Sequence, residues 1–375
     1  MPSEWRHGVL GDVLELKRGF DLPAHDRLEG SIPVVSSGGP SGTHSEAKVR
    51  GPGVVTGRYG TLGQVFFVEG PFWPLNTTLY VCDFKGNDPR FISYFLRTID
   101  YLAYSDKAAV PGVNRNHLHE ARVRWPNVET QREVASVLGA LDDKIELNRR
   151  MSETLEGMTR ALFKAWFVDR LDDLSPAGAV ETSVGAVDAS GGANDWRRVP
   201  LGEALELKRG YDLPHAQRRS GRVPIISSSG PSGFHDVPQV RGPGVVTGRY
   251  GTIGKVFLVW DDFWPLNTAL YVRDFKGADP LFALYLLRQL DFEKFSDKGA
   301  VPGINRNHVH MEPVDIPPEH LQRRFADEVR PWLTMVRSNE VQSGTLTELR
   351  DLLLPKLLSG ELGIRDAERA VEAVA

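Results

Sequence analysis

The sequence predicts an α+β protein with two homologous, mainly β domains, each followed by a long α-helix. Three observations predict this fold class. A stretch of more than a hundred residues occurs twice, each copy contains short β-type runs between turn signals, and each copy precedes an amphipathic helical pattern. At 375 residues, the chain is long enough for two or three domains with their own cores.

The repeat has a period of 191 residues. The segment GPGVVTGRYGT begins at Gly51 and again at Gly242, and the same offset relates LKRG at 16–19 to 207–210 and FWPLNT at 72–77 to 263–268. Roughly three in five positions from 5 to 126 are identical in the second copy, without a gap. Solenoid units are about 20–50 residues long, so each copy is a whole domain.

Within each copy, β-type runs such as IPVVSS, GVVTGRYG and TTLYVCDF alternate with turns rich in glycine and proline. One helix is predicted over residues 88–105, because Asp88 followed by Pro89 is a favourable helix start. Trp73 and Trp264 are expected to lie in the cores.

The stretch after the first domain has apolar residues spaced by three and four, and adding 191 reaches apolar residues again, although the rest of the surface differs. This pattern predicts two amphipathic helices with a coiled-coil-like seam. Asn148 and Asn339 occupy the same interior seam position, where a polar residue fixes register at a cost in stability; the alternative is that they face water. Pro331 predicts a kink or a short leading helix in the second stretch.

Composition and charge narrow the class of protein. The net charge of −4 argues against a simple basic coat for nucleic acid, but residues 1–126 sum to about +1 and residues 194–317 to about +2. Any bound nucleic acid should therefore contact the repeats. With one cysteine, no signal-peptide core and no apolar run of membrane length, a cytoplasmic protein without membrane contact is expected.

Candidate DNA-binding side chains recur in both copies. Basic residues are suited to phosphates, and hydroxyl, imidazole and amide groups are suited to base edges. The alternatives are a solvated loop for the serines and histidine, a structural turn or solvated charge pair for the basic residues, and helix capping for the asparagines. The candidates are Lys17, Arg18, Ser36, Ser37, Ser41, His44, Arg58, Tyr59, Lys107, Asn114 and Arg115, with Lys208, Arg209, Ser227, Ser228, Ser232, His235, Arg249, Tyr250, Lys298, Asn305 and Arg306.

No motif for catalysis is found in the sequence. There is no GxxxxGK[ST] phosphate loop and no GxG fingerprint opening a βαβ unit. The pair His117 and His119 lacks a third ligand nearby, so no metal site is expected. We therefore expect a binding protein with no catalytic residue.

Four segments resemble the specificity subunits of type I restriction–modification systems: TGRYGTLGQVFFV, FWPLNTTLYV, LFKAWFVDR and LLLPKLLSGEL. The resemblance covers essentially the whole chain. It implies target recognition domains at 1–126 and 195–317, spacer helices at 127–173 and 318–360, a flexible linker at 174–194 and a C-terminal tail at 361–375. It also implies that the helices pair as an antiparallel coiled coil with pseudo-two-fold symmetry.

The same resemblance implies the partners. Each domain would read half of a bipartite site in double-stranded DNA, and two methylation subunits and two restriction–translocation subunits would dock around the chain. S-adenosylmethionine, ATP and Mg²⁺ would be bound by those partners, with no cofactor on this chain.

One feature departs from the family pattern. The two recognition domains of the family usually differ, whereas here they are close to identical. Because protein symmetry is mirrored in a DNA site, we expect an interrupted palindrome, with Thr43 and Phe234 as a difference that could alter one base. The alternatives are an enzyme that modifies DNA alone and a scaffold that binds no DNA.

Overall fold

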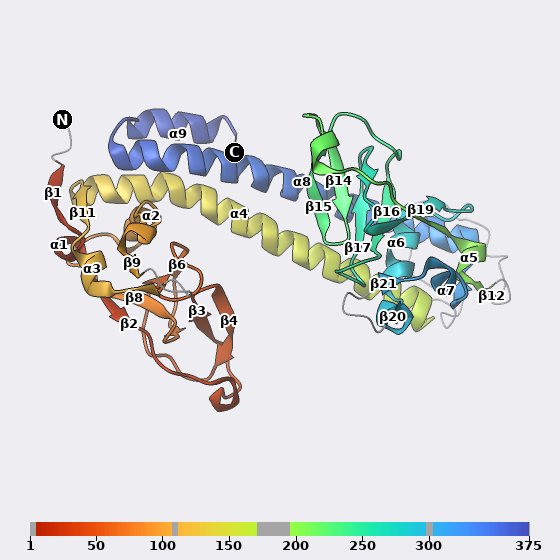
Figure 1. Cartoon of the computed structure of the whole chain (residues 1–375), viewed down its shortest axis with the longest axis horizontal. Coiled ribbons are helices and arrows are strands. Elements are labelled where there is room, and N and C mark those ends of the chain that lie inside the picture. The colour runs from red at the N-terminus through yellow and green to blue at the C-terminus, as the bar shows by residue number, and fades with distance from the viewer. Residues whose placement is uncertain (1–4, 107–111, 171–195, 298–302, 375) are drawn as a thin grey trace, which may run out of the picture. The chain divides into compact units, whose positions relative to one another are not determined.

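In the computed structural model, residues 5–106, 112–170, 196–297 and 303–374 are described. The chain forms two compact units, and the boundary between them crosses both long helices. One unit contains residues 1–149 and 339–375, and the other contains residues 150–338. Each unit therefore combines one domain with helical segments from both repeats, as the colours of Figure 1 show.

The first domain is built on two small sheets. Strands β2, β8, β5 and β6 form an antiparallel sheet in that order, and β4, β3 and β7 form a second sheet in which β3 and β7 are parallel. β1 pairs with β11 and β9 pairs with β10. The strands are β1 Arg6–Val9, β2 Glu15–Arg18, β3 Ile32–Ser36, β4 Gly39–His44, β5 Gly53–Gly57, β6 Val65–Val68, β7 Trp73–Pro74, β8 Thr78–Asp83, β9 Ser105–Asp106, β10 Gly112–Val113 and β11 Arg122–Trp125.

Three short helices complete this domain: α1 Leu10–Val13, α2 Pro89–Arg97 and α3 Arg115–His119. α2 begins as predicted, because the Asp88 carboxylate accepts a hydrogen bond from the Phe91 N–H at 2.8 Å. It ends earlier than the predicted residue 105. The side chain of Asp100 caps a separate 3₁₀ turn over Tyr101–Tyr104, which interrupts the α-helical hydrogen bonding.

The second domain repeats this order of elements. Its sheets are β13-β19-β16-β17 and β15-β14-β18, with the pairs β12–β22 and β20–β21. Its elements are β12 Arg197–Pro200, α5 Leu201–Ala204, β13 Glu206–Arg209, β14 Val223–Ser227, β15 Gly230–His235, β16 Gly244–Gly248, β17 Val256–Val259, β18 Trp264–Pro265, β19 Ala269–Asp274, α6 Pro280–Arg288, β20 Ser296–Asp297, β21 Gly303–Ile304, α7 Arg306–His310 and β22 Pro313–Ile316.

The long helices are α4, Val128–Phe163, which continues as a π-helical turn over Lys164–Val168, and α8, Glu319–Ser359. In the first unit they run antiparallel, because Asp142 contacts Arg350 while Asn148, further along α4, contacts the earlier residue Gln342. The mixed α+β class with two sheet-rich domains and two long helices is thereby confirmed.

One expectation for the second helix is corrected, and the alternative position of the seam asparagines is excluded. α8 runs without a break through Pro331, so no short leading helix exists; one missing N–H is tolerated where Val329 and Leu333 remain buried on either side. Asn148 and Asn339 do not face water, since they are only 1% and 5% exposed.

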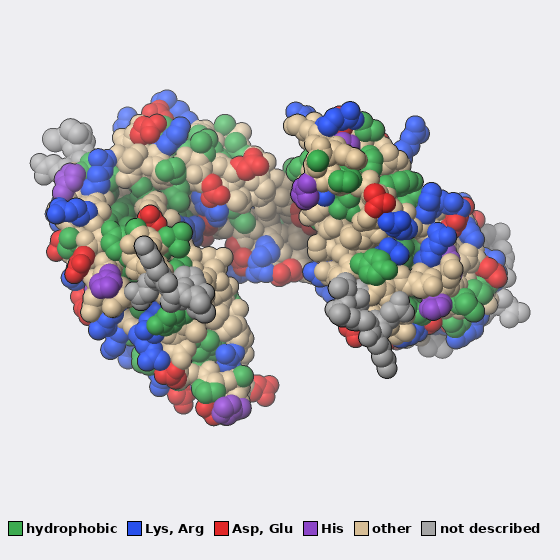
Figure 2. All heavy atoms as spheres, viewed as in Figure 1, with side chains coloured by type: hydrophobic (Ala, Val, Ile, Leu, Met, Phe, Trp, Pro, Cys, Tyr) green, Lys and Arg blue, Asp and Glu red, His purple; other side chains and the backbone are tan. Residues whose placement is uncertain are grey.

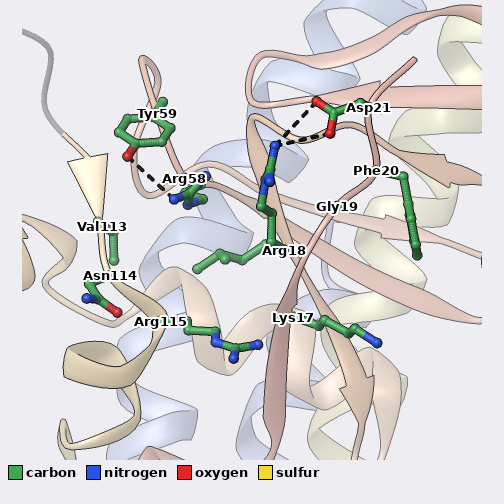
Figure 3. A pocket seen from close by; sticks show the side chains of 11 residues that line it. Lys17, Arg18, Gly19, Phe20, Asp21, Arg58, Tyr59, Val113, Asn114 and Arg115 are labelled. Carbon is green, nitrogen blue, oxygen red and sulfur yellow. Dashed lines mark hydrogen bonds and ion pairs between the residues drawn. The ribbon is translucent and has the colours of Figure 1, made fainter.

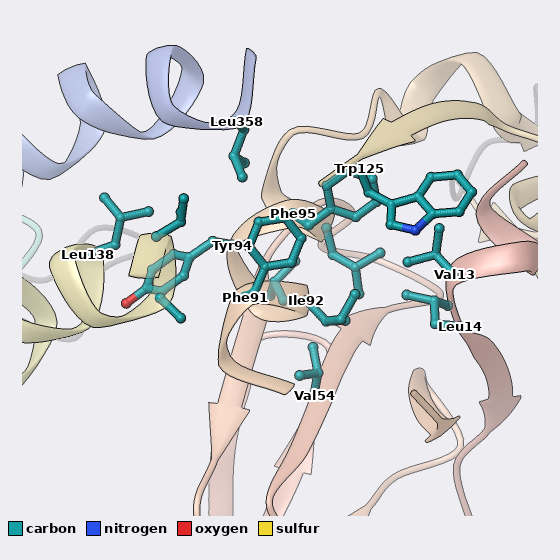
Figure 4. Packing of buried hydrophobic residues seen from close by; sticks show 14 of the residues in the cluster. Val13, Leu14, Val54, Phe91, Ile92, Tyr94, Phe95, Trp125, Leu138 and Leu358 are labelled. Carbon is teal, nitrogen blue, oxygen red and sulfur yellow. The ribbon is translucent and has the colours of Figure 1, made fainter. Parts of the chain in front are cut away.

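The first unit's core joins the domain to both helices. Figure 4 shows Tyr94, Phe95 and Trp125 of the domain packed with Leu138 of α4 and Leu358 of α8. Within the predicted C-terminal tail, helix α9 (Ile364–Glu372) lies along α8 in Figure 1 and adds Ala367 to this core. Trp73 is buried and Trp264 is half-buried.

Charged side chains are interspersed with uncharged and hydrophobic ones on the face of each domain drawn in Figure 2. This distribution agrees with the nearly neutral sums of the two repeats. A binding surface for an anion therefore has to come from a local arrangement of cations.

Candidate nucleic-acid interface

A basic hollow of about 620 Å³ lies on the first domain, where three segments distant in sequence meet (Figure 3). β2 supplies Lys17 and Arg18, the turn after β5 supplies Arg58 and Tyr59, and the start of α3 supplies Asn114 and Arg115. Six of the residues predicted to bind DNA are therefore brought together. Four cations and one carboxylate, Asp21, line the hollow, so it favours an anion.

The carboxylate holds one of the cations in place. Arg18 Nη2 lies 3.2 Å from an oxygen of Asp21, and the side-chain amide of Asn76 also donates to Asp21. Both partners of the ion pair are at least half exposed, so the pair orients Arg18 more than it stabilises the fold. The sequence interpretation missed Asp21, although its signal was visible: KRGFD in one copy and KRGYD in the other.

Tyr59 presents its ring to solvent at the rim of the hollow and is 43% exposed. The Arg58 guanidinium lies 4.5 Å from the ring centroid, and Arg58 Nη2 is 3.4 Å from the Tyr59 hydroxyl. The ring also packs on Gly112, where a Cβ atom would collide with the ring. A residue larger than glycine at 112 would therefore displace the ring, and the sequence interpretation missed this requirement.

Asn114 caps α3, as the alternative interpretation of this residue proposed. Its Oδ1 accepts a hydrogen bond from the Asn116 N–H at 3.0 Å, and Asn305 Oδ1 accepts from the Asn307 N–H at the same distance. Bidentate reading of adenine needs both the oxygen and the nitrogen of the amide. The cap occupies one lone pair of each Oδ1, so DNA binding by Asn114 and Asn305 stays a prediction, with the side-chain NH₂ groups as donors.

The second domain has the same hollow, with a volume of about 680 Å³. Arg209 pairs with Asp212 at 3.2 Å, and the Arg249 guanidinium lies 4.3 Å from the ring centroid of Tyr250. Tyr250 is 42% exposed, nearly as much as Tyr59. The candidates that line it are Lys208, Arg209, Arg249, Tyr250, Asn305 and Arg306.

The histidines predicted to read bases are buried instead. His44 is 4% exposed, its Nδ1 accepts from the Leu28 N–H at 3.0 Å, and its ring meets Trp73 edge-on at 5.1 Å. His235 is equally buried and accepts from the Arg219 N–H at 3.1 Å. Base reading by His44 and His235 is therefore wrong, because both rings face the domain interior and support a loop.

Most of the candidate serines serve the hairpins β3–β4 and β14–β15. Ser36 Oγ donates to the Gly39 carbonyl and Ser227 Oγ to the Gly230 carbonyl, both at 2.9 Å. Ser41 Oγ donates to the Val34 carbonyl at 3.4 Å, and Ser232 Oγ is buried. Hydrogen bonds within the hairpins therefore occupy the hydroxyls of Ser36, Ser41 and Ser227, while burial keeps the Ser232 hydroxyl from solvent.

Ser37 and Ser228 lie elsewhere on the hairpins, at the tips, beside the turns that carry the exposed tyrosines. Ser37 lies next to Gly60, and Ser228 lies next to Gly251. They therefore remain candidates, adjacent to the hollows. Lys107 and Lys298 lie outside the described residues.

His119 holds in place strand β2, which lines the hollow. Its Nε2 accepts a hydrogen bond from the Leu16 N–H of β2 at 2.9 Å, so the imidazole is neutral at that nitrogen. Burial, followed by the nearby Arg115, lowers the pKa of His119. His310 holds Leu207 in the same way in the second domain. Among the residues that the structure describes, no three His, Cys, Asp or Glu side chains gather as a metal site requires.

Comparisons with known proteins agree with this geometry. Residues 2–157 match the family model described as the type I restriction modification DNA specificity domain. The MjaIX specificity subunit of Methanocaldococcus jannaschii is 21% identical over 333 residues, covering 81% of this chain and 76% of the relative. The HindI specificity subunit of Haemophilus influenzae is 25% identical over 386 residues, covering 80% and 84%.

The fold is also that of a solved relative. The crystal structure of the type I restriction–modification S subunit from M. genitalium superposes with a TM-score of 0.64 at 18% identity, covering 95% of this chain and 96% of that one. The class defined by the fold and the matched domain is that of proteins that recognise DNA sequence. Residues 2–157 match that specificity domain, and about four fifths of the chain is similar to specificity subunits of type I restriction–modification systems, in agreement with the resemblance drawn from its sequence.

None of the described helices combines the length and the apolar character that crossing a membrane demands.

Proposed function

We propose that this chain reads a bipartite DNA site whose two halves are inverted copies of one word. Each domain contacts one half-site, with its basic hollow on the phosphate backbone and the neighbouring hairpin tip near the base edges. The chain contributes no catalysis and directs methylation and restriction by two methylation and two restriction–translocation subunits. S-adenosylmethionine, ATP and Mg²⁺ are bound by those partners.

The observation that carries the proposal is the identity of the charged side chains, the exposed tyrosine and the asparagine in the two hollows. Lysine, three arginines, tyrosine and asparagine occupy equivalent positions in both, each 191 residues apart. Long cations beside an exposed ring suit a phosphodiester flanked by a sugar or base. Since the same groups are presented twice, the same DNA word is expected twice, on opposite strands.

One exposed residue differs between the two domains and limits the symmetry expected of the DNA site. Phe234 on β15 is 62% exposed, and its counterpart on β4 is Thr43. An exposed aromatic ring can contact the methyl group of thymine. The half-site read by the second domain can therefore differ from the other at one base.

The experiment is methylome sequencing of cells that express this chain with its methylation subunit. The expected result is an interrupted palindrome, methylated at equivalent adenines on both strands. Exchanging residues 1–126 with 195–317 should leave the methylated sites unchanged. Two unrelated half-site words would contradict the proposal, while a single-base asymmetry that disappears in Phe234→Thr would assign that base to Phe234.

Two alternatives are tested with the purified chain. Incubation with labelled S-adenosylmethionine and DNA would reveal an enzyme that modifies DNA alone, and we expect no transfer of label. A gel shift on random DNA, with and without the methylation subunit, would reveal a scaffold that binds no DNA, and we expect binding when the subunit is present.

A further inference from the structure

Each compact unit is a composite of the two repeats. The first domain packs against the C-terminal part of α8, which belongs to the second repeat, and the second domain packs against the C-terminal part of α4, which belongs to the first. Because the repeats are related by 191 residues, the same contact can be compared in both units. We call one domain together with the long helix that follows it a half. If two copies of the same half could pair, the contacting residues of the two units would match. Three sets of contacts show that these residues do not match.

The first set is a charge layer present in one unit. Asp142 on α4 accepts hydrogen bonds from the Tyr94 hydroxyl of α2 and from Arg350 Nη1 of α8, both at 2.7 Å. Asp142 and Arg350 are three-quarters buried or more. In the second unit, Leu333 stands in the place of Asp142 and Thr159 in the place of Arg350, and both are buried.

The second set lies at the helix ends. In the first unit, Arg124 of the domain lies 4.6 Å from the Trp5 ring centroid and donates to the Ser359 carbonyl at the end of α8. In the second unit, Asp315 stands in the place of Arg124. The cation comes from the helix instead, since Arg170 lies 4.3 Å from the Trp196 ring centroid and 3.2 Å from Asp315.

The third set is apolar and differs in size. The end of α8 presents Leu357 and Leu358 to the first unit, where Val134 lies in the core. At the end of α4, the π-helical turn presents the larger Trp166 and Phe167 to the second unit. There Phe325 stands in the place of Val134 and packs on both rings, at 6.3 and 5.3 Å between centroids.

We propose that these contacts form a pairing code, in which each domain accepts the helix end of the other repeat and rejects the helix end of its own. A first half paired with a like half would place Asp142 against Thr159 and Arg124 against Arg170. A second half paired with a like half would place Arg350 against Leu333 and would remove Arg170 from Asp315, which would keep Arg198 of its own domain. The code therefore selects the unlike half as partner, although the DNA-reading domains are nearly identical.

The charge layer can be tested in the intact chain, because single substitutions reproduce the rejected layers. Arg350→Thr leaves Asp142 facing threonine, as two first halves would, and Asp142→Leu leaves Arg350 facing leucine, as two second halves would. Each should lower Tm, since a largely buried ion pair is broken, although Asp142 keeps Arg97 and Arg350 keeps Asp351. The double variant recreates the layer of the second unit and should recover more than half of the summed decrease in Tm.

The contact at the helix end is tested by a second double-mutant cycle. Asp315→Arg places a third arginine beside Arg170 and Arg198, and Arg170→Gly removes one of the two arginines that pair with Asp315. The two combined resemble the first unit, where Arg124 lies over Trp5 and Gly360 packs against the same ring. Each single variant should lower Tm and the double variant should recover. Arg132→Thr, on the exposed side of α4, is the control and should leave Tm unchanged. Additive decreases in both cycles, or unchanged Tm in the single variants, would overturn the pairing code.

Discussion

Polar residues near the hollows divide into those that hold the backbone and those that face outward. His44, Asn114 and Ser36 resemble base readers by residue type, yet each directs its oxygen or nitrogen to a nearby backbone group. The residue types alone could not separate these roles, since imidazole, amide and hydroxyl groups serve caps and turns as well as base edges. The long cations were predicted to bind DNA, and the structure brings four of them together in each hollow. Their exposure was predictable, since such side chains are rarely buried without partners.

The role of the hollows in binding phosphate can be tested with Arg58→Ala and Arg249→Ala together. We expect weaker binding to every DNA sequence, and a slope of log K against log salt that is shallower by about 1 for each phosphate that is no longer bound. Fluorescence anisotropy in the presence of the methylation subunit measures both. Arg122→Ala, exposed on β11, is the control. If binding to the specific site weakened while binding to other DNA did not, the two arginines would instead be shown to read bases.

The buried imidazoles under β2 and β13 predict a pH dependence of stability. Burial lowers the pKa of His119 and His310 below the ordinary value of 6.5. The unfolded chain therefore takes up protons first as pH falls, so their contribution is complete above about 6.5 and declines below it. Tm measured from pH 7.5 to 5.5 should fall, and the fall should be smaller in His119→Gln/His310→Gln. An identical profile in that variant would exclude this origin.

At the scale of elements, the helical seam was the most predictable feature, because apolar spacing records burial directly. The polar layer within it is also clear in the structure. Asn148 Nδ2 donates to Gln342 Oε1 at 2.9 Å, and Asn339 Nδ2 lies 3.4 Å from the Asn148 carbonyl. Asn148 Oδ1 is buried with no partner among the described atoms, so the layer costs stability.

Asn148→Leu tests whether that cost maintains the register of the helices. An apolar residue at a buried seam position should raise Tm by a few degrees, and it should also permit neighbouring registers. The methylome of cells expressing the variant should then show sites with more than one spacer length. Ile145→Leu, an apolar exchange one turn away, is the control. A higher Tm with a single unchanged spacer length would show that other contacts fix the register.

Other elements were beyond prediction from sequence. The end of α2 depends on Asp100 capping a new turn, and the π-helical turn depends on Trp166 and Phe167 fitting the second unit. Helix α9 is short, and its burial rests on contacts with residues distant in sequence. A single sequence records the local preference of such segments and not the surfaces that later cover them.

At the scale of the whole molecule, the repeat alone predicted two equivalent domains, while the composite units were not foreseen. A period of 191 residues shows that a domain recurs, but identical spacing is compatible with each domain packing on its own helix or on the other one. The difference lies in residues such as Asp142 and Arg350, which are 208 positions apart.

If the helices set the distance between half-sites, lengthening both should lengthen the spacer. Four helix-forming residues inserted after Glu153, with four more after Arg337, add about 6 Å, close to two base pairs at roughly 3.4 Å each. The register of Asn148 with Gln342 places these two points opposite each other. The methylome should show the same half-site words with a longer spacer. Four residues inserted into 174–194 should change nothing, and an unchanged spacer in the helix variant would contradict the ruler.

The exchange of helix ends between the repeats also shapes how the chain is made. The first domain and its stretch of α4 leave the ribosome early, but the leucines of α8 that complete their core, Leu353 to Leu358, follow some two hundred residues later. At about 5–20 residues per second, the apolar surface around Tyr94 and Leu138 stays exposed for roughly 10–40 s before the end of α8 is synthesised. The core of the first unit is therefore completed only when synthesis is nearly finished.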